Sequence, residues 1–291
     1  MILIILWGDV GPPAFQKNLS YKNNTDVHLN SRVKEIKEFK NVDILFLGSS
    51  RSYRHYDPRI FAKRGYSSFN LGSNSQTFLQ TEVLVKRHLR NLNLRLVVID
   101  IYPGMFNSDG VESSLDIISN DQLDNQTFKM VLLQKNIKVF NTFIYSWYRN
   151  QFHKASIEIE KRKKGYDTYI SGGYVEKILT YSHSISSDTI NFNIKNYQLD
   201  SFLNIIEYFK QNKTKFIIVQ SPRHKRMAYK DESKLDSIFK LENVEYHNYS
   251  YFPGLDDTLH FYDSKHLNQN GVKIFDEFLI DNVLQYKYLM P

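Results

Sequence analysis

The stretch of sequence that decides the fold reads Val42-Asp43-Ile44-Leu45-Phe46-Leu47-Gly48-Ser49-Ser50. A short apolar run that ends in small residues predicts a buried strand leading into a tight turn. Because nearly every residue of the run is apolar, we expect helices to cover both faces of its sheet. Polar residues at the end of such a strand lie where an open parallel sheet binds its ligands.

Short apolar runs alternate with amphipathic stretches on both sides of this strand. Further strands are predicted at 66–71, 95–101, 215–220 and 244–248. Helices are predicted at 30–39, from 58 onward, and at 76–92, 201–211, 231–240 and 271–285. This alternation indicates an α/β fold, a three-layer α/β/α sandwich with a central, mainly parallel sheet.

Residues 105–200 interrupt the alternation. They contain helical stretches at 121–135 and 137–151 and a basic run, Lys161–Lys164, which is typical of a solvated helix face. We interpret this region as a helical insertion that covers or borders the site. The predicted organisation is an N-terminal segment, 1–40, and one α/β domain, 41–291, with the insertion at about 105–200.

The chain begins with seven apolar residues, Met1–Trp7. A membrane-spanning helix needs about 20 such residues, and neither a basic segment before them nor a clear cleavage site after them marks a signal peptide. Two interpretations stay open at this point. The segment is the remnant of a longer membrane anchor, or it is an ordinary buried strand.

Composition narrows the functional classes. The chain of 291 residues has 42% hydrophobic residues, a formal net charge of +7 and no cysteine. The absence of cysteine excludes disulfides, thiolate catalysis and cysteine zinc sites. The basic excess suits an anionic partner, such as a polyanionic glycan or a membrane surface, or simply belongs to a slightly basic soluble protein. No nucleic-acid motif and no metal-ligand set is visible, so we expect no nucleic acid, metal or cofactor.

Three motifs follow predicted strands or precede the last helix. Ser50, in a glycine-assisted turn, can hold its hydroxyl above the sheet edge. The polar loop Asn70–Thr77 offers backbone donors for an oxyanion, or caps the next helix. Asp263 and His266 are three residues apart, so the carboxylate can fix the imidazole tautomer while the other ring nitrogen meets a serine. Each motif alone also has an ordinary structural explanation.

Together and in this order, the motifs resemble the SGNH (GDSL-like) hydrolase superfamily. Its Gly-Asp-Ser block is met as Gly48–Ser50, its second block as Asn70–Thr77 and its Asp-x-x-His block as Asp263–His266. The resemblance covers roughly residues 41–104 and 215–286 and is closest to envelope-associated branches, those of alginate O-acetylation and teichoic-acid D-alanylation. It implies a flavodoxin-like sandwich and a catalytic triad of Ser50, His266 and Asp263.

The sequence departs from the family pattern on the oxyanion side. Ser49 stands for the acidic residue of the first block, and Ser75 for the second-block glycine. Ile101-Tyr102-Pro103-Gly104 replaces the third block, Gly-x-Asn-Asp. We therefore expect the oxyanion donors to come from Ser75, Gly72 and Asn74, with Asn74 standing in for the missing asparagine. A lost donor costs about 10²–10³ in rate elsewhere, so a slow or inactive site stays an alternative.

Four further residues are candidates for substrate binding. Arg51 and His55 follow the nucleophile, and Arg223 and His224 end another central strand. Arg51 either binds a carboxylate or phosphate of the substrate or pairs with an acidic neighbour in the fold. Arg223 and His224 belong to a cationic loop that either binds an anionic polymer or is merely solvated.

The sequence thus predicts a serine-dependent acyl-ester hydrolase or O-acyltransferase. The resemblance implies an acylated glycan or other anionic surface polymer as substrate, a cell-envelope location and a membrane-bound acyl donor protein as partner. One alternative is a non-catalytic module on the same fold that binds or helps assemble a polymer. Another is a cytoplasmic esterase for a small substrate.

Overall fold

The computed structural model describes residues 1–291 except 12–18, 20–27, 153–159, 179–186 and 290–291. Its centre is a five-stranded sheet in which every neighbouring pair is parallel. In spatial order the strands are β2 (Ser68–Gly72), β1 (Asn41–Gly48), β3 (Asn93–Asp100), β8 (Phe216–Gln220) and β10 (Tyr246–Asn248). Counted within the sheet, this is the order 2-1-3-4-5 of flavodoxin-like folds. The predicted fold class is confirmed.

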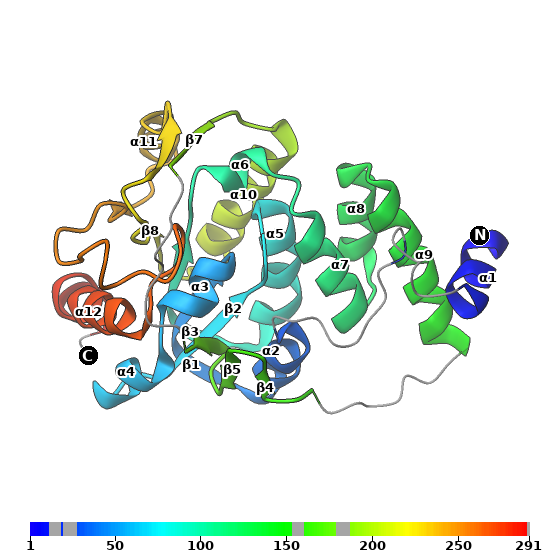
Figure 1. Ribbon diagram of the computed structural model, residues 1–291, viewed down its shortest axis with the longest axis horizontal. Helices are drawn as coiled ribbons and strands as arrows, with labels where there is room; N and C mark the ends of the chain where they lie inside the picture. The colour runs from blue at the N-terminus through cyan, green and yellow to red at the C-terminus, as the bar shows by residue number, and fades with distance from the viewer. Residues whose placement is uncertain (12–18, 20–27, 153–159, 179–186, 290–291) are drawn as a thin grey trace.

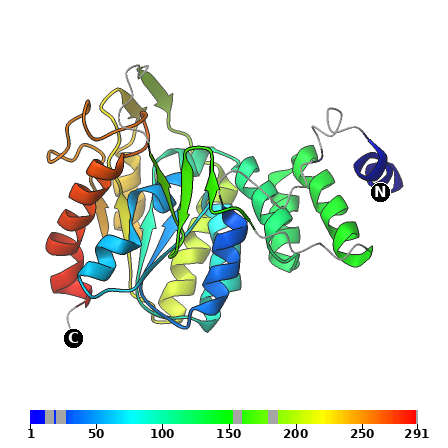
Figure 2. The ribbon, with the colours of Figure 1, turned by 60° about the horizontal axis from the view of Figure 1, so that its bottom comes forward.

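Helices cover both faces of the sheet (Figures 1 and 2). One layer contains α2 (Leu29–Glu35), α5 (Phe78–His88), α10 (Asn196–Gln211) and α11 (Lys234–Leu241). The other contains α4 (Pro58–Lys63), α12 (Gln269–Leu279) and the π-helix Ile280–Leu289 that continues it. Successive side chains of a strand point to opposite faces. Leu45 and Leu47 of β1 therefore pack in the first layer, and Ile44 and Phe46 pack in the second.

The predicted N-terminal segment is not uniform. The helix predicted at 30–39 is α2 followed by a short 3₁₀ turn, Ile36–Glu38. Leu29, Val33 and Ile36 are fully buried and join the main hydrophobic core. A similar 3₁₀ turn, Leu89–Asn91, extends α5. The last part of the N-terminal segment is therefore packed as part of the α/β sandwich.

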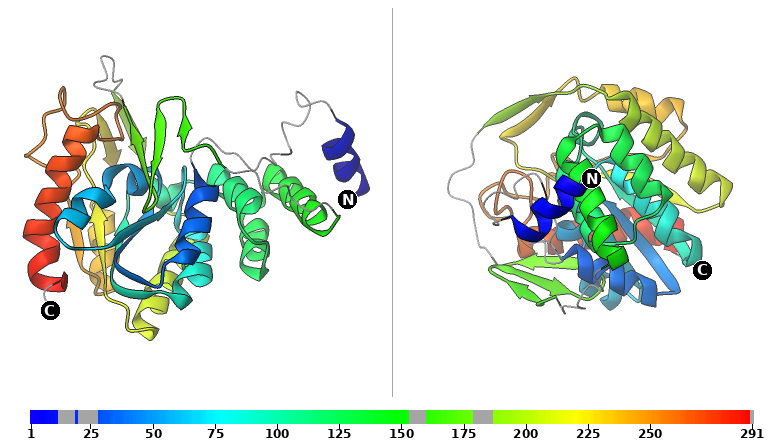
Figure 3. Two further views of the ribbon diagram at one scale, coloured as in Figure 1. Left: turned by 90° about the horizontal axis from the view of Figure 1, so that it is seen from below. Right: turned by 90° about the vertical axis from the view of Figure 1, so that its right-hand side faces the viewer.

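The first residues form a helix, α1 (Ile2–Val10), so the buried strand considered for them is wrong. None of its side chains is buried, although it rests on α9 (Ile137–Phe152), and the Tyr145 ring leaves no room for a Cβ at Gly8. Figure 3 shows α1 against α9, at the opposite end of the molecule from α12. In the described ranges, no helix combines the length and hydropathy needed to cross a membrane.

The region predicted as a helical insertion begins with α6 (Gly104–Asn107), α7 (Val111–Asn120), α8 (Asn125–Gln134) and α9. It continues with an antiparallel sheet of β4 (Lys163–Lys164), β5 (Asp167–Ile170) and β6 (Tyr174–Lys177), and then with β7 (Asp188–Asn191), which pairs with β9 (Met227–Lys230). The basic run at 161–164 was predicted to lie on a helix. This prediction is wrong, since the run leads into β4. Lys164 in this run forms an ion pair with Glu160. The Glu160 side chain is buried, so the pair supplies the charged partner that a buried carboxylate requires.

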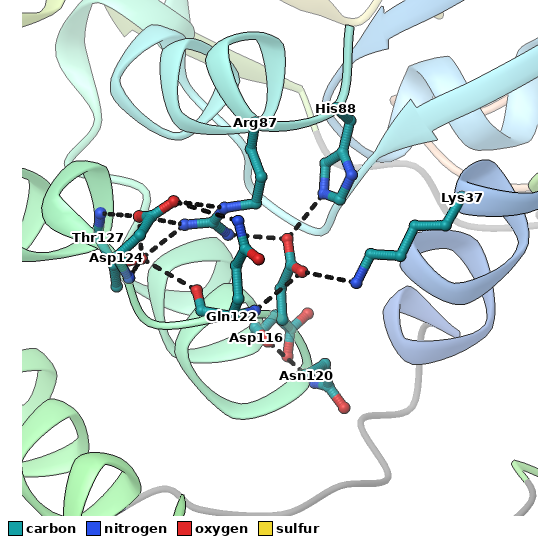
Figure 4. A network of polar contacts seen from close by, with 9 residues as sticks. Lys37, Arg87, His88, Asp116, Asn120, Gln122, Asp124 and Thr127 are labelled. Carbon is teal, nitrogen blue, oxygen red and sulfur yellow. Dashed lines mark hydrogen bonds and ion pairs between the residues drawn. The ribbon is translucent and has the colours of Figure 1, made fainter. Parts of the chain in front are cut away.

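A buried ion-pair network joins α5 to the loop between α7 and α8 (Figure 4). The Arg87 guanidinium donates to Asp121 at 2.7 Å and to both carboxylate oxygens of Asp124, at 2.7 and 3.0 Å. His88 contacts the same Asp121 oxygen at 2.8 Å. Burial would raise the pKa of Asp121, but the hydrogen bond of His88 and the charge of Arg87 outweigh it and lower the pKa. The network ties the insertion to the sandwich.

We expect Arg87→Met to lower the free energy of unfolding by about 3–5 kcal/mol, because it leaves the Asp121 carboxylate buried without its main partner. Lys37→Met is the matched control. Lys37 pairs with the same carboxylate at 3.4 Å but is 53% exposed, so its loss should cost less than about 1 kcal/mol. Urea unfolding of both variants measures the difference, and equal losses would contradict a special role for Arg87.

Candidate active site

A glycine at the end of β1 sets the position of Ser50. Gly48 has φ +146°, and a Cβ there would lie 2.4 Å from the backbone oxygen of Asp100 on β3. Only glycine fits such a close approach. Ser49 then caps α3 (Ser50–His55), its hydroxyl accepting from the Arg51 N–H at 3.4 Å. Ser50 is thus the first residue of a short helix at the carboxyl edge of the sheet.

The structure brings Asp263 and His266 to this serine. Both lie in the loop before α12, whose first turn is capped by Asn268. The Ser50 Oγ lies 2.8 Å from His266 Nε2. The Asp263 carboxylate lies 2.9 and 3.0 Å from His266 Nδ1 and accepts from the backbone N–H of His266 at 2.8 Å. A chain of hydrogen bonds therefore runs from carboxylate to imidazole to hydroxyl.

The electrostatics favour an ionised Asp263 and a neutral His266. Burial alone would raise the pKa of Asp263, but the hydrogen bond and charge of His266 outweigh burial and hold it at about 2. Burial lowers the pKa of His266 below 6.5, more strongly than Asp263 raises it. With the Nδ1 proton directed at the carboxylate, Nε2 presents a lone pair to Ser50. The Tyr262 ring stacks on the imidazole at 5.4 Å between centroids and limits its rotation.

The second polar loop lies beside the serine, held by the insertion. Glu112 at the start of α7 accepts from the Asn74 amide at 2.7 Å and from the Ser75 hydroxyl at 2.8 Å. Ser75 has φ +53°, a conformation that favours glycine. The family pattern has a glycine at the position of Ser75, and glycine adopts this backbone conformation without strain.

Two backbone N–H groups qualify as oxyanion donors. Within the described part of the chain, the backbone N–H groups of Ser50 and Ser75 donate no hydrogen bond. Both residues line the same cavity. Asn74 also lines this cavity, but its side-chain amide donates to Glu112. Gly72 does not line it. A Cβ at Gly72 would lie 2.8 Å from the oxygens of Gly48 and Ser49, so its role is close packing against the turn.

The cavity in front of Ser50 has a volume of about 150 Å³. Its walls come from the start of α3, from three loops and from β9; they are Ser49, Ser50, Arg51, Asn74, Ser75, Tyr102, Met227, Tyr229, Lys265 and His266. Arg51 is 4% exposed and donates to the backbone oxygens of Pro222 at 3.2 Å and Lys265 at 3.4 Å. Its Nη1 is buried without a partner in the described structure. The Arg51 side chain lines the cavity, and a guanidinium there is suited to an anionic or carbonyl oxygen of a ligand.

The other predicted substrate contacts lie elsewhere. Arg223 is buried in a two-pronged ion pair with Glu232, at 2.6 and 2.8 Å, and does not line the cavity. His224 is 7% exposed, and its Nδ1 accepts from the Arg226 N–H. Both side chains are held by internal partners and neither lines the cavity. Arg223 and His224 are therefore not among the proposed substrate contacts.

His55 lies behind the triad and takes part in a buried hydrogen-bonded chain. The Leu267 N–H donates to His55 Nε2 at 3.2 Å, so the ring proton is on Nδ1, 3.0 Å from Ser221 Oγ. That hydroxyl donates to Asp100 at 2.8 Å. Burial lowers the pKa of His55 well below 6.5, which keeps the ring neutral. The geometry fits a residue that positions the His266 loop instead of one that touches substrate.

Several cavity residues were not anticipated from the sequence. Tyr102 was noted only as part of a missing motif, although the strand-end rule that selected Ser50 applies equally to it. Met227 and Tyr229 belong to β9, a strand that no periodic pattern in the sequence predicted. Glu112, which holds the cavity residues Asn74 and Ser75, belongs to α7, a helix not predicted from the sequence. Among the described residues, no group of three or more His, Asp or Glu is arranged to hold a metal ion.

Comparisons with known proteins give only distant likenesses. No protein-family model matches the chain, and no curated protein matches it significantly. A Bacteroides fragilis structure provisionally described as an acylhydrolase has 13% identity and a TM-score of 0.44, covering 88% of this chain and 95% of that one. A GDSL-like lipase from Bacteroides thetaiotaomicron has 15% identity and a TM-score of 0.43, covering 88% and 97%. At such scores, function has to be argued from the site itself.

If this site is catalytic, kcat/KM should fall at acid pH with a midpoint below 6.5, because His266 must be neutral to accept a proton and its pKa is lowered. A pH–rate profile from about pH 4 to pH 8 measures this. Asp263→Asn should reduce the rate by about 10⁴, by analogy with other triads. An acid limb centred above 6.5 would contradict the assignment of His266 as base.

Proposed function

We propose that the protein is a serine-dependent acyl-ester hydrolase or O-acyltransferase of the SGNH type. The observation that carries this proposal is the unbroken hydrogen-bonded chain Asp263–His266–Ser50, which opens into a cavity. An imidazole oriented by a carboxylate and bonded to a serine hydroxyl is the arrangement that makes serine nucleophilic near neutral pH.

In the proposed mechanism, Ser50 Oγ attacks the ester carbonyl while His266 Nε2 takes the hydroxyl proton. The oxyanion of the tetrahedral intermediate accepts hydrogen bonds from the N–H groups of Ser50 and Ser75. The protonated imidazole, stabilised by Asp263, donates its proton to the leaving alcohol, and the acyl group stays on Ser50. Water as acceptor then completes ester hydrolysis, and a sugar hydroxyl completes acyl transfer.

The proposed substrate carries a negative charge near the ester. Arg51 supports this, since it is a cationic side chain that lines the cavity. Tyr102 and Tyr229 also line the cavity. Their aromatic rings can stack on a sugar ring, and their hydroxyls can form hydrogen bonds with sugar hydroxyls. We accordingly propose an acylated glycan or related anionic surface polymer, an envelope location and a membrane-bound acyl donor when the protein acts as a transferase.

One observation favours an alternative, a catalytically weak module that binds or helps assemble a polymer. Tyr102 lines the cavity near the position where the family pattern supplies an asparagine. The Asn74 amide, the candidate substitute, is engaged by Glu112 at 2.7 Å. With two backbone donors instead of three, turnover would fall by about 10²–10³, while the cavity would still bind substrate.

The hydrolase proposal is tested by labelling with a serine-directed fluorophosphonate. Wild-type protein should label, and Ser50→Ala should abolish labelling because it removes the only attacking atom of the proposed site. Ser49→Ala, which removes only the helix cap one residue earlier, should still label. Turnover of p-nitrophenyl acetate should follow the same pattern. If wild type does not label under conditions in which a control esterase does, the weak module is the better description.

The anionic substrate is tested with a matched pair, O-acetylated glucuronic acid and O-acetylated glucose, which differ by one carboxylate. Wild type should prefer the glucuronate by about tenfold or more in kcat/KM, the typical contribution of a charge-assisted hydrogen bond. Arg51→Gln should erase this preference through a higher KM, and Arg51→Lys should keep part of it. Equal losses on both substrates would show that Arg51 only holds the loops in place.

A further inference from the structure

The outer side of α1, α8 and α9 exposes an unusual number of large apolar side chains. On α1 they are Ile2, Leu3, Leu6, Trp7 and Val10, with 46–79% of each exposed. On α8 and α9 they are Phe128, Leu132, Leu133, Ile137, Phe140, Trp147 and Phe152, with 36–71% exposed. Contiguous exposed apolar surface of this kind marks an interaction site. We call these twelve side chains the outer apolar face.

The outer apolar face is continuous from helix to helix. Ile137, Phe140, Ile144 and Trp147 recur at i, i+3, i+7 and i+10 and so form one stripe along α9. Along one edge of this stripe, α1 packs on α9, where Asp9 accepts from the hydroxyl of Tyr145 at 2.9 Å and of Tyr148 at 3.0 Å. Along the other edge, the ring of Phe143 meets Phe128 of α8 at 5.9 Å between centroids.

Positive charge predominates around this face. Residues 125–152 contain no Asp or Glu but contain Lys129, Lys135, Lys138 and Arg149, of which Lys129 pairs with Glu82 of α5 at 3.4 Å. Among the described residues, no carboxylate lies within ion-pair distance of Lys135 or Lys138, which flank the turn into α9. The acid of α1, Asp9, is engaged by two tyrosine hydroxyls. Lysines without a carboxylate partner beside an apolar face are complementary to a surface that is apolar inside and anionic outside.

The aromatic residues of this face fit a position at a membrane surface. Interfacial helices bury their apolar faces about 5–10 Å deep. The two tryptophans of the chain, Trp7 and Trp147, are both half-exposed on this face, and indole rings favour the membrane–water boundary.

We propose that the outer apolar face binds the surface of a membrane that carries anionic lipids. The face lies at the α1–α9 end of the molecule, away from α3 and α12, which flank the proposed active site (Figures 1 and 3). The cavity in front of Ser50 therefore stays accessible while the protein is bound. This inference does not depend on the proposed catalysis, because it rests on other residues.

The two native tryptophans provide the test. The purified full chain is titrated with vesicles of phosphatidylglycerol and phosphatidylcholine and with vesicles of phosphatidylcholine alone. A blue shift of tryptophan emission and co-sedimentation with the mixed vesicles are expected, both weaker with phosphatidylcholine alone and at high salt. Absence of binding to both kinds of vesicle overturns the proposal. A blue shift that grows with protein concentration without lipid also overturns it and indicates a second copy of the chain as occupant.

Matched variants locate the surface. Phe140→Asp, in the middle of the stripe, should weaken partitioning into mixed vesicles about tenfold or more. Lys135→Gln combined with Lys138→Gln should weaken binding to the mixed vesicles only. Leu241→Asp is the control, since Leu241 is 84% exposed on α11, outside the face, and should change partitioning less than about twofold. Equal losses in Phe140→Asp and Leu241→Asp, with unchanged circular dichroism, would contradict the assignment of the surface.

Discussion

The close approach of the backbones at the end of β1 is the constraint on which the rest of the site depends. A Cβ at Gly48 would lie 2.4 Å from the Asp100 oxygen, and a Cβ at Gly72, on the other side, would lie 2.8 Å from the oxygens of Gly48 and Ser49. Three adjacent strands of a parallel sheet thus converge at one edge without side chains between them. This convergence lets Ser50 stand at the edge with the second loop beside it, because nothing larger than hydrogen separates the strand ends.

A buried polar layer holds the loop that faces this edge. His55, Ser221 and Asp100 form a hydrogen-bonded chain that ends on the Leu267 N–H, next to His266. Arg51 binds the backbone oxygens of Pro222 and Lys265 from the cavity side. Burial raises the pKa of Asp100 to about 6, although the charge of Arg51 opposes it. Since each member is held by its neighbours, the distance between Ser50 and His266 is defined by the interior of the fold and not by the exposed loop alone.

The insertion contributes residues both to the candidate site and to a surface far from it. Its helix α7 supplies Glu112, which holds the loop of Asn74 and Ser75 in a backbone shape that serine seldom adopts. Further out, α8 and α9 carry the outer apolar face together with α1. The ion pairs of Arg87 couple both parts to α5. In the proposal, one insertion therefore shapes the oxyanion side and also orients the molecule on a surface.

The sequence by itself determined the sandwich and selected the residues of the candidate site. Apolar runs of strand length and their alternation with amphipathic helices depend on local periodicity, so the sandwich could be predicted. Ser50 was selected at a strand end, and Asp263 and His266 by their spacing and by the resemblance of the three motifs, in this order, to the SGNH pattern. Only the tertiary structure decided the neighbours. Arg223 forms an ion pair with Glu232, and His55 forms a hydrogen bond with Ser221 in the interior. Met227 and Tyr229 line the cavity. The helical form of α1 was equally hidden, because an all-apolar segment has no period that separates helix from strand. Such contacts join residues far apart in the chain, and no local pattern encodes them.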